Sequence, residues 1–385
     1  MLIYNARILA EDGVIERGWL RIDGEQIDAV SDTPPPDDSP RIDAGGRTLA
    51  PGFIDIHVHG GGGHEAMDAT PEALRGLSAF YARHGVTGFL ATTWTAADTA
   101  ILNALQTVAD VMADPAALNG ADLLGAHVEG PYINENKSGA QPDGYIRRAD
   151  RAEFDAWRAT GVIRRVTIAP EFEANQALAA DCAKRGISVS AGHTDATFTQ
   201  MQEAVARGVD STTHTFNAMR GLHHREPGTV GAALLLSQLR CEVIADGVHL
   251  HPAIVDLLWR VKGADGLIMI TDAVRGAGLA EGTIYQQDGR RVTVRDGSAY
   301  LDDGTLAGST LTMSAAVQNV ARFTACDFAQ LWPCFSRTPA RVIGVDDITG
   351  SIATGKRADL VLLDDALNVT QTIVKGRVVY DVAID

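Results

Sequence analysis

Long apolar segments are absent from this sequence: no run among its 385 residues approaches the roughly 20 apolar residues that a membrane-spanning helix needs. Cysteine is scarce, with four residues and no C-x-x-C pair, so we expect reduced thiols rather than a disulfide framework. The first residues lack a charged segment followed by an apolar one, and we therefore expect no signal peptide. Together these absences predict a cytoplasmic protein that does not bind membranes.

Basic residues are outnumbered: 33 lysines and arginines stand against 49 aspartates and glutamates, which gives a formal net charge of -16. Proteins that bind nucleic acids or anionic membranes usually present a basic surface, so we expect neither partner. A few local cations can still bind a small anionic substrate. Hydrophobic residues make up 45% of the chain, as in globular proteins, and its length is enough for one large barrel with a smaller domain beside it.

The first 50 residues contain short segments typical of β-strands. Residues 2–9 are rich in apolar side chains, and residues 19–22 and 26–30 flank an Asp-Gly turn as the strands of a hairpin do. Residues 33–38 favour a loop, because their prolines lack the N–H groups that a strand ladder needs. These strands are too few to bury a core of their own.

The other end of the chain has a similar pattern. Residues 350–364 and 369–380 are again typical of β-strands. We expect the two ends, residues 1–50 and 345–385, to pair into one small β-sandwich domain beside the rest of the chain.

From residue 51 onward, apolar segments of strand length alternate with segments of helix length. The eight predicted strands are Phe53–Ile56, Val86–Thr92, Asp122–Glu129, Ile163–Ala169, Ile187–Gly192, Val209–Thr213, Cys241–Ala245 and Leu267–Thr271. The predicted helices are Pro71–His84, Ala96–Ala113, Arg151–Ala159, Asn175–Arg185, Phe198–Arg207 and Pro252–Lys262. Apolar strands that alternate with helices indicate a parallel sheet covered by helices. Eight strands in such an alternation predict a (β/α)8 TIM barrel over residues 51–344.

One segment interrupts this alternation. Residues 279–308 contain alternating stretches separated by Asp-Gly turns, which predict a β-hairpin insertion. A helical pattern returns at Leu311–Thr324. Within the barrel, Pro71 suits the first turn of its helix, and Thr70 is expected to cap that helix.

The first predicted barrel strand ends in an unusual pair of histidines. His57 and His59 are two residues apart, so they point to the same face of a strand, and Asp55 shares that face. The glycines that follow let the backbone turn away and leave these side chains uncovered. Two imidazoles so placed can bind one metal ion.

Other polar residues stand at the ends of four further predicted strands. The complete set is His57, His59, Glu129, His193, His214 and Asp272. The carboxyl ends of barrel strands surround one mouth, where the active sites of this fold lie. Nitrogen and oxygen ligands of this kind suit Zn²⁺ or another first-row divalent ion. His127 shares the face of Glu129 and is expected to support the ligands rather than to bind the ion.

Two loops carry positive charge close to this mouth. Arg225 follows the sixth predicted strand and His249 the seventh. An arginine can bind a phosphate or carboxylate through two hydrogen bonds, but an ion pair with Glu226 explains Arg225 equally well. A long loop after the third strand carries Ala140 and Gln141 and can fold over the mouth.

These motifs together resemble the N-acetylglucosamine-6-phosphate deacetylases of the amidohydrolase superfamily. The segments that carry the resemblance are PGFIDIHVHG, HVEGPYIN, KSGAQP, AGHTDA, THTFNAMRGLHHREPG, IADGVHL, ITDA and GSIATGKRADLVLLD. They are distributed over essentially the whole chain. The resemblance implies metal-dependent hydrolysis of N-acetyl-D-glucosamine 6-phosphate to D-glucosamine 6-phosphate and acetate, in amino-sugar catabolism.

The resemblance also implies roles for the residues at the mouth. Glu129, His193 and His214 match the metal ligands found throughout the family. His57 and His59 match a pair present in members that can hold a second ion, with Glu129 as the bridge. The implied cofactor is one or two divalent ions, Zn²⁺ foremost and Fe²⁺ as an alternative.

Further residues match the catalytic and substrate-binding positions of the family. Asp272 matches the catalytic acid and base. The matches to substrate contacts are Ala140, Gln141, Asn217, Ala218, Arg225 and His249. Gln141 stands where some members have a histidine that helps to polarise the acetyl carbonyl. In relatives the arginine reaches the site of the neighbouring subunit, which implies a homodimer.

Three other functions fit parts of the pattern. A deacetylase for another acetamido sugar phosphate, such as N-acetylgalactosamine 6-phosphate, differs by one hydroxyl contact. A dihydroorotase or hydantoinase typically bridges two metals with a carboxylated lysine, whereas the bridging position here is Glu129. A scaffold without activity predicts gaps in the ligand set, and the ligand set has none.

Overall fold

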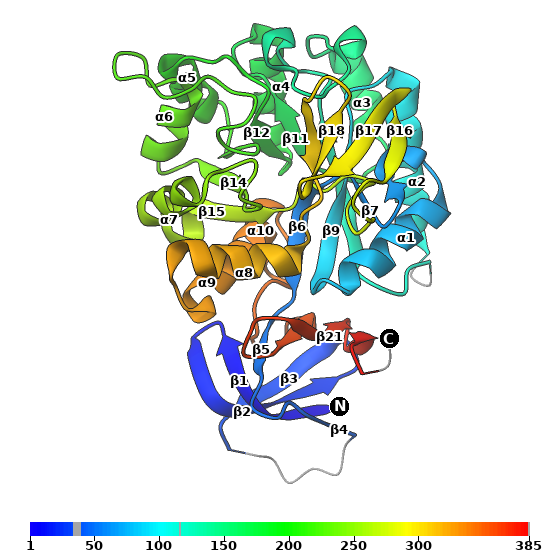
Figure 1. Cartoon of the computed structure of the whole chain (residues 1–385), viewed down its shortest axis with the longest axis vertical. Helices are drawn as coiled ribbons and strands as arrows, with labels where there is room; N and C mark the ends of the chain where they lie inside the picture. The colour runs from blue at the N-terminus through cyan, green and yellow to red at the C-terminus, as the bar shows by residue number, and fades with distance from the viewer. Residues whose placement is uncertain (34–39, 115–116, 384–385) are drawn as a thin grey trace.

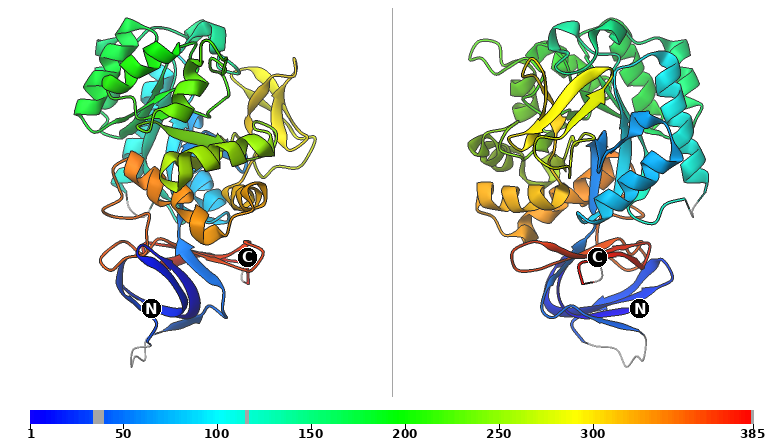
Figure 2. Two further views of the ribbon diagram at one scale, coloured as in Figure 1. Left: turned by 90° about the vertical axis from the view of Figure 1, so that its left-hand side faces the viewer. Right: turned by 45° about the vertical axis from the view of Figure 1, so that its right-hand side comes forward.

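The computed structural model describes residues 1–33, 40–114 and 117–383. A large α/β barrel stands on a small β-domain, which lies at one end of the barrel in every view (Figures 1 and 2). The loop predicted over residues 33–38 lies, apart from Thr33, outside the described residues.

The barrel contains one parallel sheet of eight strands, in the order β15-β14-β13-β12-β11-β10-β9-β6. Its strands are β6 (Phe53–Val58), β9 (Val86–Thr93), β10 (Asp122–Glu129), β11 (Ile163–Ile168), β12 (Ser188–Ala191), β13 (Ser211–Thr212), β14 (Arg240–Ile244) and β15 (Leu267–Ile270). The backbone N–H of Asp272, just beyond β15, donates to the carbonyl oxygen of His57 over 3.0 Å, which joins the two ends of the sheet. All the predicted strands are present, and the predicted TIM barrel is confirmed.

Helices cover the outside of this sheet. They are α1 (Pro71–Ala82), α2 (Asp98–Ala113), α3 (Arg151–Arg158), α4 (Glu173–Lys184), α5 (Phe198–Ala206), α6 (Gly228–Leu235), α7 (Pro252–Gly266), α8 (Met313–Thr324), α9 (Phe328–Phe335) and α10 (Arg337–Val342). Thr70 caps α1 as predicted, because its side chain accepts a hydrogen bond from the N–H of Ala73. In the described ranges, we find no helix with the length and apolar character to cross a membrane.

Three of these helices are not predicted from the sequence, for two physical reasons. Helix α6 is apolar around most of its circumference and buried over its first six residues, so it has no polar face to give a period. Helices α9 and α10 contain Pro333 and Pro339, which favour a break in sequence.

The predicted insertion forms an antiparallel sheet of four strands, one hairpin larger than expected. Its strands are β16 (Ile284–Gln287), β17 (Arg290–Arg295), β18 (Ser298–Leu301) and β19 (Leu306–Ser309). Figure 1 shows this sheet in yellow at the end of β6 that faces away from the small β-domain. Val292 and Ala299 of the insertion pack in one apolar cluster with Trp94 and Ala140 of the barrel. A two-stranded ribbon, β7 (Gly60–Gly61) with β8 (His64–Glu65), lies directly after β6.

The small β-domain is one continuous sheet built from both ends of the chain. Its strands are β1 (Leu2–Ala10), β2 (Gly13–Asp23), β3 (Gln26–Ser31), β4 (Arg41–Asp43), β5 (Thr48–Pro51), β20 (Leu360–Leu363), β21 (Val369–Val374) and β22 (Arg377–Asp381). Strand β5 pairs with both β1 and β20 and so joins the two ends. The sheet curls around its own core, because Ala358 hydrogen-bonds to the turns at both edges, at Glu25 and Gly376.

One prediction in this domain was wrong. The strand expected from residue 350 begins only at Leu360. Gly350 and Gly355 have φ angles of 89° and 87°, so the backbone turns twice before the strand starts. The division of the chain at residues 50/51 and 344/345 stays a prediction.

Candidate metal centre and active site

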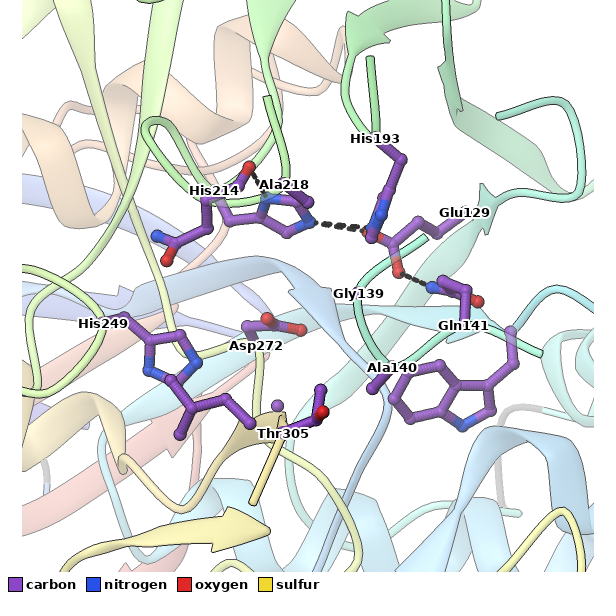
Figure 3. Close-up of a pocket in the computed structure, with 14 residues that line it drawn as sticks. Glu129, Gly139, Ala140, Gln141, His193, His214, Ala218, His249, Asp272 and Thr305 are labelled. Carbon is purple, nitrogen blue, oxygen red and sulfur yellow. Dashed lines mark hydrogen bonds and ion pairs between the residues drawn. The ribbon is translucent and has the colours of Figure 1, made fainter. Parts of the chain in front are cut away.

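A pocket opens at the carboxyl ends of the barrel strands (Figure 3). It is lined by Trp94, Glu129, Gly139, Ala140, Gln141, His193, His214, Asn217, Ala218, His249, Asp272, Thr305, Leu306 and Gly308. The predicted catalytic residue, three of the predicted metal ligands and five of the predicted substrate contacts are in this set. His57 and His59 are fully buried and lie behind Glu129 and Asp272.

Glu129, the last residue of β10, stands in the middle of the imidazoles. Its Oε1 lies 3.3 Å from Nε2 of His193 and 3.1 Å from Nε2 of His214. The same oxygen is 3.4 Å from Nε2 of His57, and Oε2 is 3.2 Å from Nε2 of His59. Glu129 therefore belongs to two ligand groups, one with His57 and His59 and one with His193 and His214.

Both groups have the properties of metal sites. Within each, the ligand atoms lie within 4.8 Å of one another and the residues are buried. Among the residues that the structure describes, none is a hydrogen-bond partner of Nε2 of His57 or of Nε2 of His59, although both atoms are buried. A divalent cation would satisfy these nitrogens, and imidazole with carboxylate is a donor set that Zn²⁺ prefers. The residues present thus fit one or two such ions.

Hydrogen bonds on the far side of the rings fix their orientation. Nδ1 of His193 lies 2.8 Å from the carbonyl oxygen of Lys137, and Nδ1 of His214 lies 3.2 Å from that of Asn217. Nδ1 of His57 lies 2.9 Å from Oε2 of Glu242. An oxygen acceptor at Nδ1 keeps the proton there, so Nε2 is left free to bind a metal.

The backbone is strained where three of these residues leave their strands. His193, His214 and Asp272 each follow the last residue of a strand by two positions, and their φ angles are 47°, 31° and 48°. Residues other than glycine rarely adopt this left-handed backbone conformation. In folded proteins such residues occur most often at functional sites. The turn brings all three side chains over the mouth.

Burial and the neighbouring imidazoles act in opposite directions on the pKa values of the two carboxylates in the centre. Burial alone would raise the pKa of Glu129, but the surrounding imidazoles, His57 foremost, hold it well below its usual range. In the same way His57 and His59 lower the pKa of Asp272 against the effect of burial, so both carboxylates are ionised. Oδ1 of Asp272 lies 3.4 Å from Nε2 of His57 and 3.3 Å from Nε2 of His59.

The two predicted cationic residues lie in different surroundings. His249 lines the pocket, and its Nδ1 lies 2.6 Å from Oδ2 of Asp246. Arg225 is exposed on the loop before α6 and does not line the pocket of its own chain. Glu226, the partner in the alternative interpretation, instead accepts from the backbone N–H groups of Phe198 (2.8 Å) and Gly228 (3.1 Å).

Sequence reasoning missed three residues of the centre. Glu242 and Arg165 are charged residues inside apolar strands, and both are fully buried. That position is the signal that would have found them, because buried charges need partners. Trp94 stacks on His59 with ring centroids 3.8 Å apart, and its only signal is a position just after the second barrel strand.

Comparison with known proteins places this site in a family. The sequence matches the profile of the amidohydrolase family over residues 48–379. N-acetylglucosamine-6-phosphate deacetylase of Bacillus subtilis (strain 168) is 39% identical over 99% of this chain and 97% of its own length. N-acetylgalactosamine-6-phosphate deacetylase of Escherichia coli O157:H7 is 38% identical over 96% of this chain and 97% of its own.

A solved structure agrees with the sequence matches. N-acetylglucosamine-6-phosphate deacetylase from Thermotoga maritima superposes with a TM-score of 0.89 at 37% identity, over 99% of this chain and all of that one. The family match and the relatives both extend over nearly the whole length, and this chain therefore belongs to the amidohydrolase family.

Proposed function

We propose that the protein hydrolyses the acetamide of N-acetyl-D-glucosamine 6-phosphate to D-glucosamine 6-phosphate and acetate, as a step of amino-sugar catabolism. The observation that carries the proposal is the convergence of Asp272 with Glu129, His193 and His214 in one pocket. Near full-length relatives with this name support the choice of substrate. A phosphorylated sugar is a substrate of the cytoplasm, which is where we expect the protein to act.

Glu129, His193 and His214 would hold one divalent ion, and His57, His59 and Glu129 would hold a second. Zn²⁺ is the expected metal, because its preferred ligands are imidazole nitrogens and carboxylate oxygens; Fe²⁺ is the alternative. A bound ion of this kind supplies Lewis-acid activation of water and of the acetyl carbonyl.

Asp272 is the proposed general base and acid. Its carboxylate lines the pocket beside the proposed ligands, with Oδ1 3.3 Å from Nε2 of His59, and can accept the proton of the attacking water. It then returns this proton to the amine nitrogen as the bond to the acetyl carbon breaks. Gln141 lines the same pocket with an amide N–H₂ that can donate to the acetyl oxygen.

The sugar phosphate is held away from the reacting bond. Ala140, Asn217, Ala218 and His249 line the pocket and are the proposed contacts of the chain itself. Nδ2 of Asn217 is buried without a hydrogen-bond partner in the described part of the chain, so it is free to donate to the substrate. Such contacts orient the acetamide over the centre, and their binding energy contributes to positioning.

The first experiment follows acetate release and metal content on the same sample of purified protein. Metal-dependent release from N-acetyl-D-glucosamine 6-phosphate, lost on chelation and restored by Zn²⁺, is expected. Bound metal without acetate release would support the proposed metal site but refute the proposed substrate. Full activity in protein stripped of metal would refute the mechanism.

The galactosamine epimer is the second candidate substrate, because a relative at 38% identity bears that name. The ratio of kcat/KM for the two epimers under identical conditions decides between them. A ratio of about 5 to 150 in favour of the glucosamine compound is expected, because one well-made hydroxyl contact is worth about 1–3 kcal/mol.

We further propose a homodimer in which Arg225 binds the phosphate in the neighbouring site. The exposure of Arg225 outside its own pocket supports this arrangement. Arg225→Ala and Asp272→Asn subunits, each nearly inactive alone, should recover activity when mixed, because one site of the mixed dimer has both wild-type residues. No recovery in a mixture that forms mixed dimers would show that the arginine acts within its own subunit.

A further inference from the structure

Glu242 connects the metal centre to the interior of the barrel. It lies in β14 and is fully buried. Its Oε2 is 2.9 Å from Nδ1 of His57 and accepts a hydrogen bond from the backbone N–H of His214 over 3.1 Å. One carboxylate oxygen thus contacts a member of each ligand group.

The other oxygen of Glu242 is fixed by an ion pair. Oε1 accepts from Nη2 of Arg165 over 2.7 Å, and Arg165 is itself fully buried in β11. The guanidinium also donates to the hydroxyl oxygens of Ser188 (2.6 Å) and Ser211 (2.9 Å). The carboxylate therefore has one orientation, with a single oxygen left for His57.

We propose that Glu242 is a positioning residue that enables His57, His59 and Glu129 to hold a metal ion of their own, beside the ion at Glu129, His193 and His214. As the acceptor for Nδ1, Glu242 keeps the proton on that nitrogen and directs the lone pair of Nε2 toward Glu129. The inference rests on the proposed function only in requiring a metal centre; it does not depend on the substrate.

The isosteric variant Glu242→Gln tests this geometry. A glutamine has one oxygen where the carboxylate has two, and Arg165 requires an acceptor. With the oxygen toward Arg165, the amide N–H₂ faces Nδ1 of His57 and the N–H of His214. His57 must then accept at Nδ1 and carry its proton on Nε2, and a protonated Nε2 cannot bind a metal.

Asp210→Asn is the matched control. Asp210 lies 3.8 Å from Nη1 of Arg165 and accepts from Ser188 and Ser211 over 3.1 and 2.6 Å. The variant makes the same acid-to-amide change against the same arginine without a contact to His57. Any change in Zn²⁺ binding by Asp210→Asn therefore measures the effect of disturbing the buried charges around Arg165.

The measurement is Zn²⁺ per chain by mass spectrometry, with calorimetric titration of the metal-free protein. Two ions are expected in the wild type and in Asp210→Asn, and one tightly bound ion in Glu242→Gln and in His57→Gln. Loss of such an orienting partner weakens metal binding about 10- to 100-fold, so the second ion should reappear in Glu242→Gln at high Zn²⁺. One ion in the wild type, or two tight ions in Glu242→Gln, would overturn the proposal.

A second measurement needs only the wild-type protein and so stands if Glu242→Gln does not fold. Histidine ¹⁵N spectra of the Zn²⁺-loaded protein should show His57 with its proton on Nδ1 and metal on Nε2. A proton on Nε2 of His57 would contradict the role of Glu242. Neither measurement involves acetate release, so the inference can fail while the proposed function holds, and the reverse.

Discussion

Gln141 donates a hydrogen bond from Nε2 to Oε2 of Glu129 over 2.7 Å, which ties the loop after β10 to the carboxylate at the centre of the proposed metal ligands. The amide oxygen of Gln141 accepts from the backbone N–H of Thr95 over 2.8 Å. These two bonds assign the amide orientation and aim its nitrogen into the site (Figure 3). Gln141 is therefore pre-oriented as a donor.

Gln141→Leu should lower kcat for the proposed reaction by about 10- to 100-fold, because a pre-oriented donor near a developing oxyanion is lost. Because Gln141 also hydrogen-bonds to Glu129, its loss can weaken metal binding, and kcat should be compared at saturating Zn²⁺ with the metal content measured on the same samples. Gln141→His keeps an N–H donor and should retain more of the activity. A wild-type kcat in Gln141→Leu would exclude a role for this side chain in the reaction.

Asp272→Asn should lower kcat by about 10²- to 10⁴-fold with metal still bound, because an amide cannot accept the proton of water. Asparagine tolerates the left-handed backbone that this position requires, with φ at 48°, so the fold should be kept. Metal analysis, circular dichroism and acetate release on one preparation check all three points. Near wild-type turnover would remove Asp272 from the mechanism.

Arg290 supports the same loop from the insertion. Its Nη2 donates to the carbonyl oxygen of Ala140 over 2.7 Å. Arg290→Met should raise KM by about 5-fold with little change in kcat, because one hydrogen bond that orders the pocket wall is worth roughly 1 kcal/mol. Arg290→Lys should restore part of the loss. A fall in kcat at constant KM would contradict a role in ordering the loop.

We expect His84 to make the fold sensitive to mild acid. Burial, with a smaller contribution from Arg83, lowers the pKa of His84 to about 4. An unfolded histidine has a pKa of about 6.5, so the unfolded chain binds the proton first and stability falls as pH drops from 6.5 toward 4. The contribution lost between pH 7 and pH 5 is on the order of 1–2 kcal/mol.

His84→Gln removes this titration and can still hydrogen-bond to Ser314, the partner of Nδ1 in the wild type at 3.1 Å. Urea unfolding of both proteins at pH 7 and pH 5 makes the comparison, in which the titration of other groups cancels. The variant should lose less stability than the wild type over this interval. Equal losses would show that the pKa of His84 is the same in the folded and the unfolded chain.

Much of the fold follows from local periodicity. The strands of the barrel are apolar runs of limited length, and alternation along a strand places His57 and His59 on one side. Glu129, His193 and Asp272 were found because the carboxyl ends of parallel strands meet at one mouth, a rule that needs no knowledge of contacts.

The remainder depends on which side chains meet inside the barrel and at its mouth. Glu242 contacts Arg165 across the barrel, and no spacing in the sequence relates these two residues. The Thr305–Gly308 segment lines the pocket only because the insertion folds back over Ala140. Such relationships arise from the packing of distant segments, which local pattern does not encode.

The pairing of β5 has a consequence for the synthesis of the chain. This strand leads directly into the barrel, yet one of its partners is β1 and the other is β20. Because roughly 300 residues separate β5 from β20, a ribosome needs roughly 15–60 s to make the missing neighbour. Until then the edge of β5 that pairs with β20 has no neighbour, and we expect the nascent chain to be most prone to edge-to-edge aggregation in this interval.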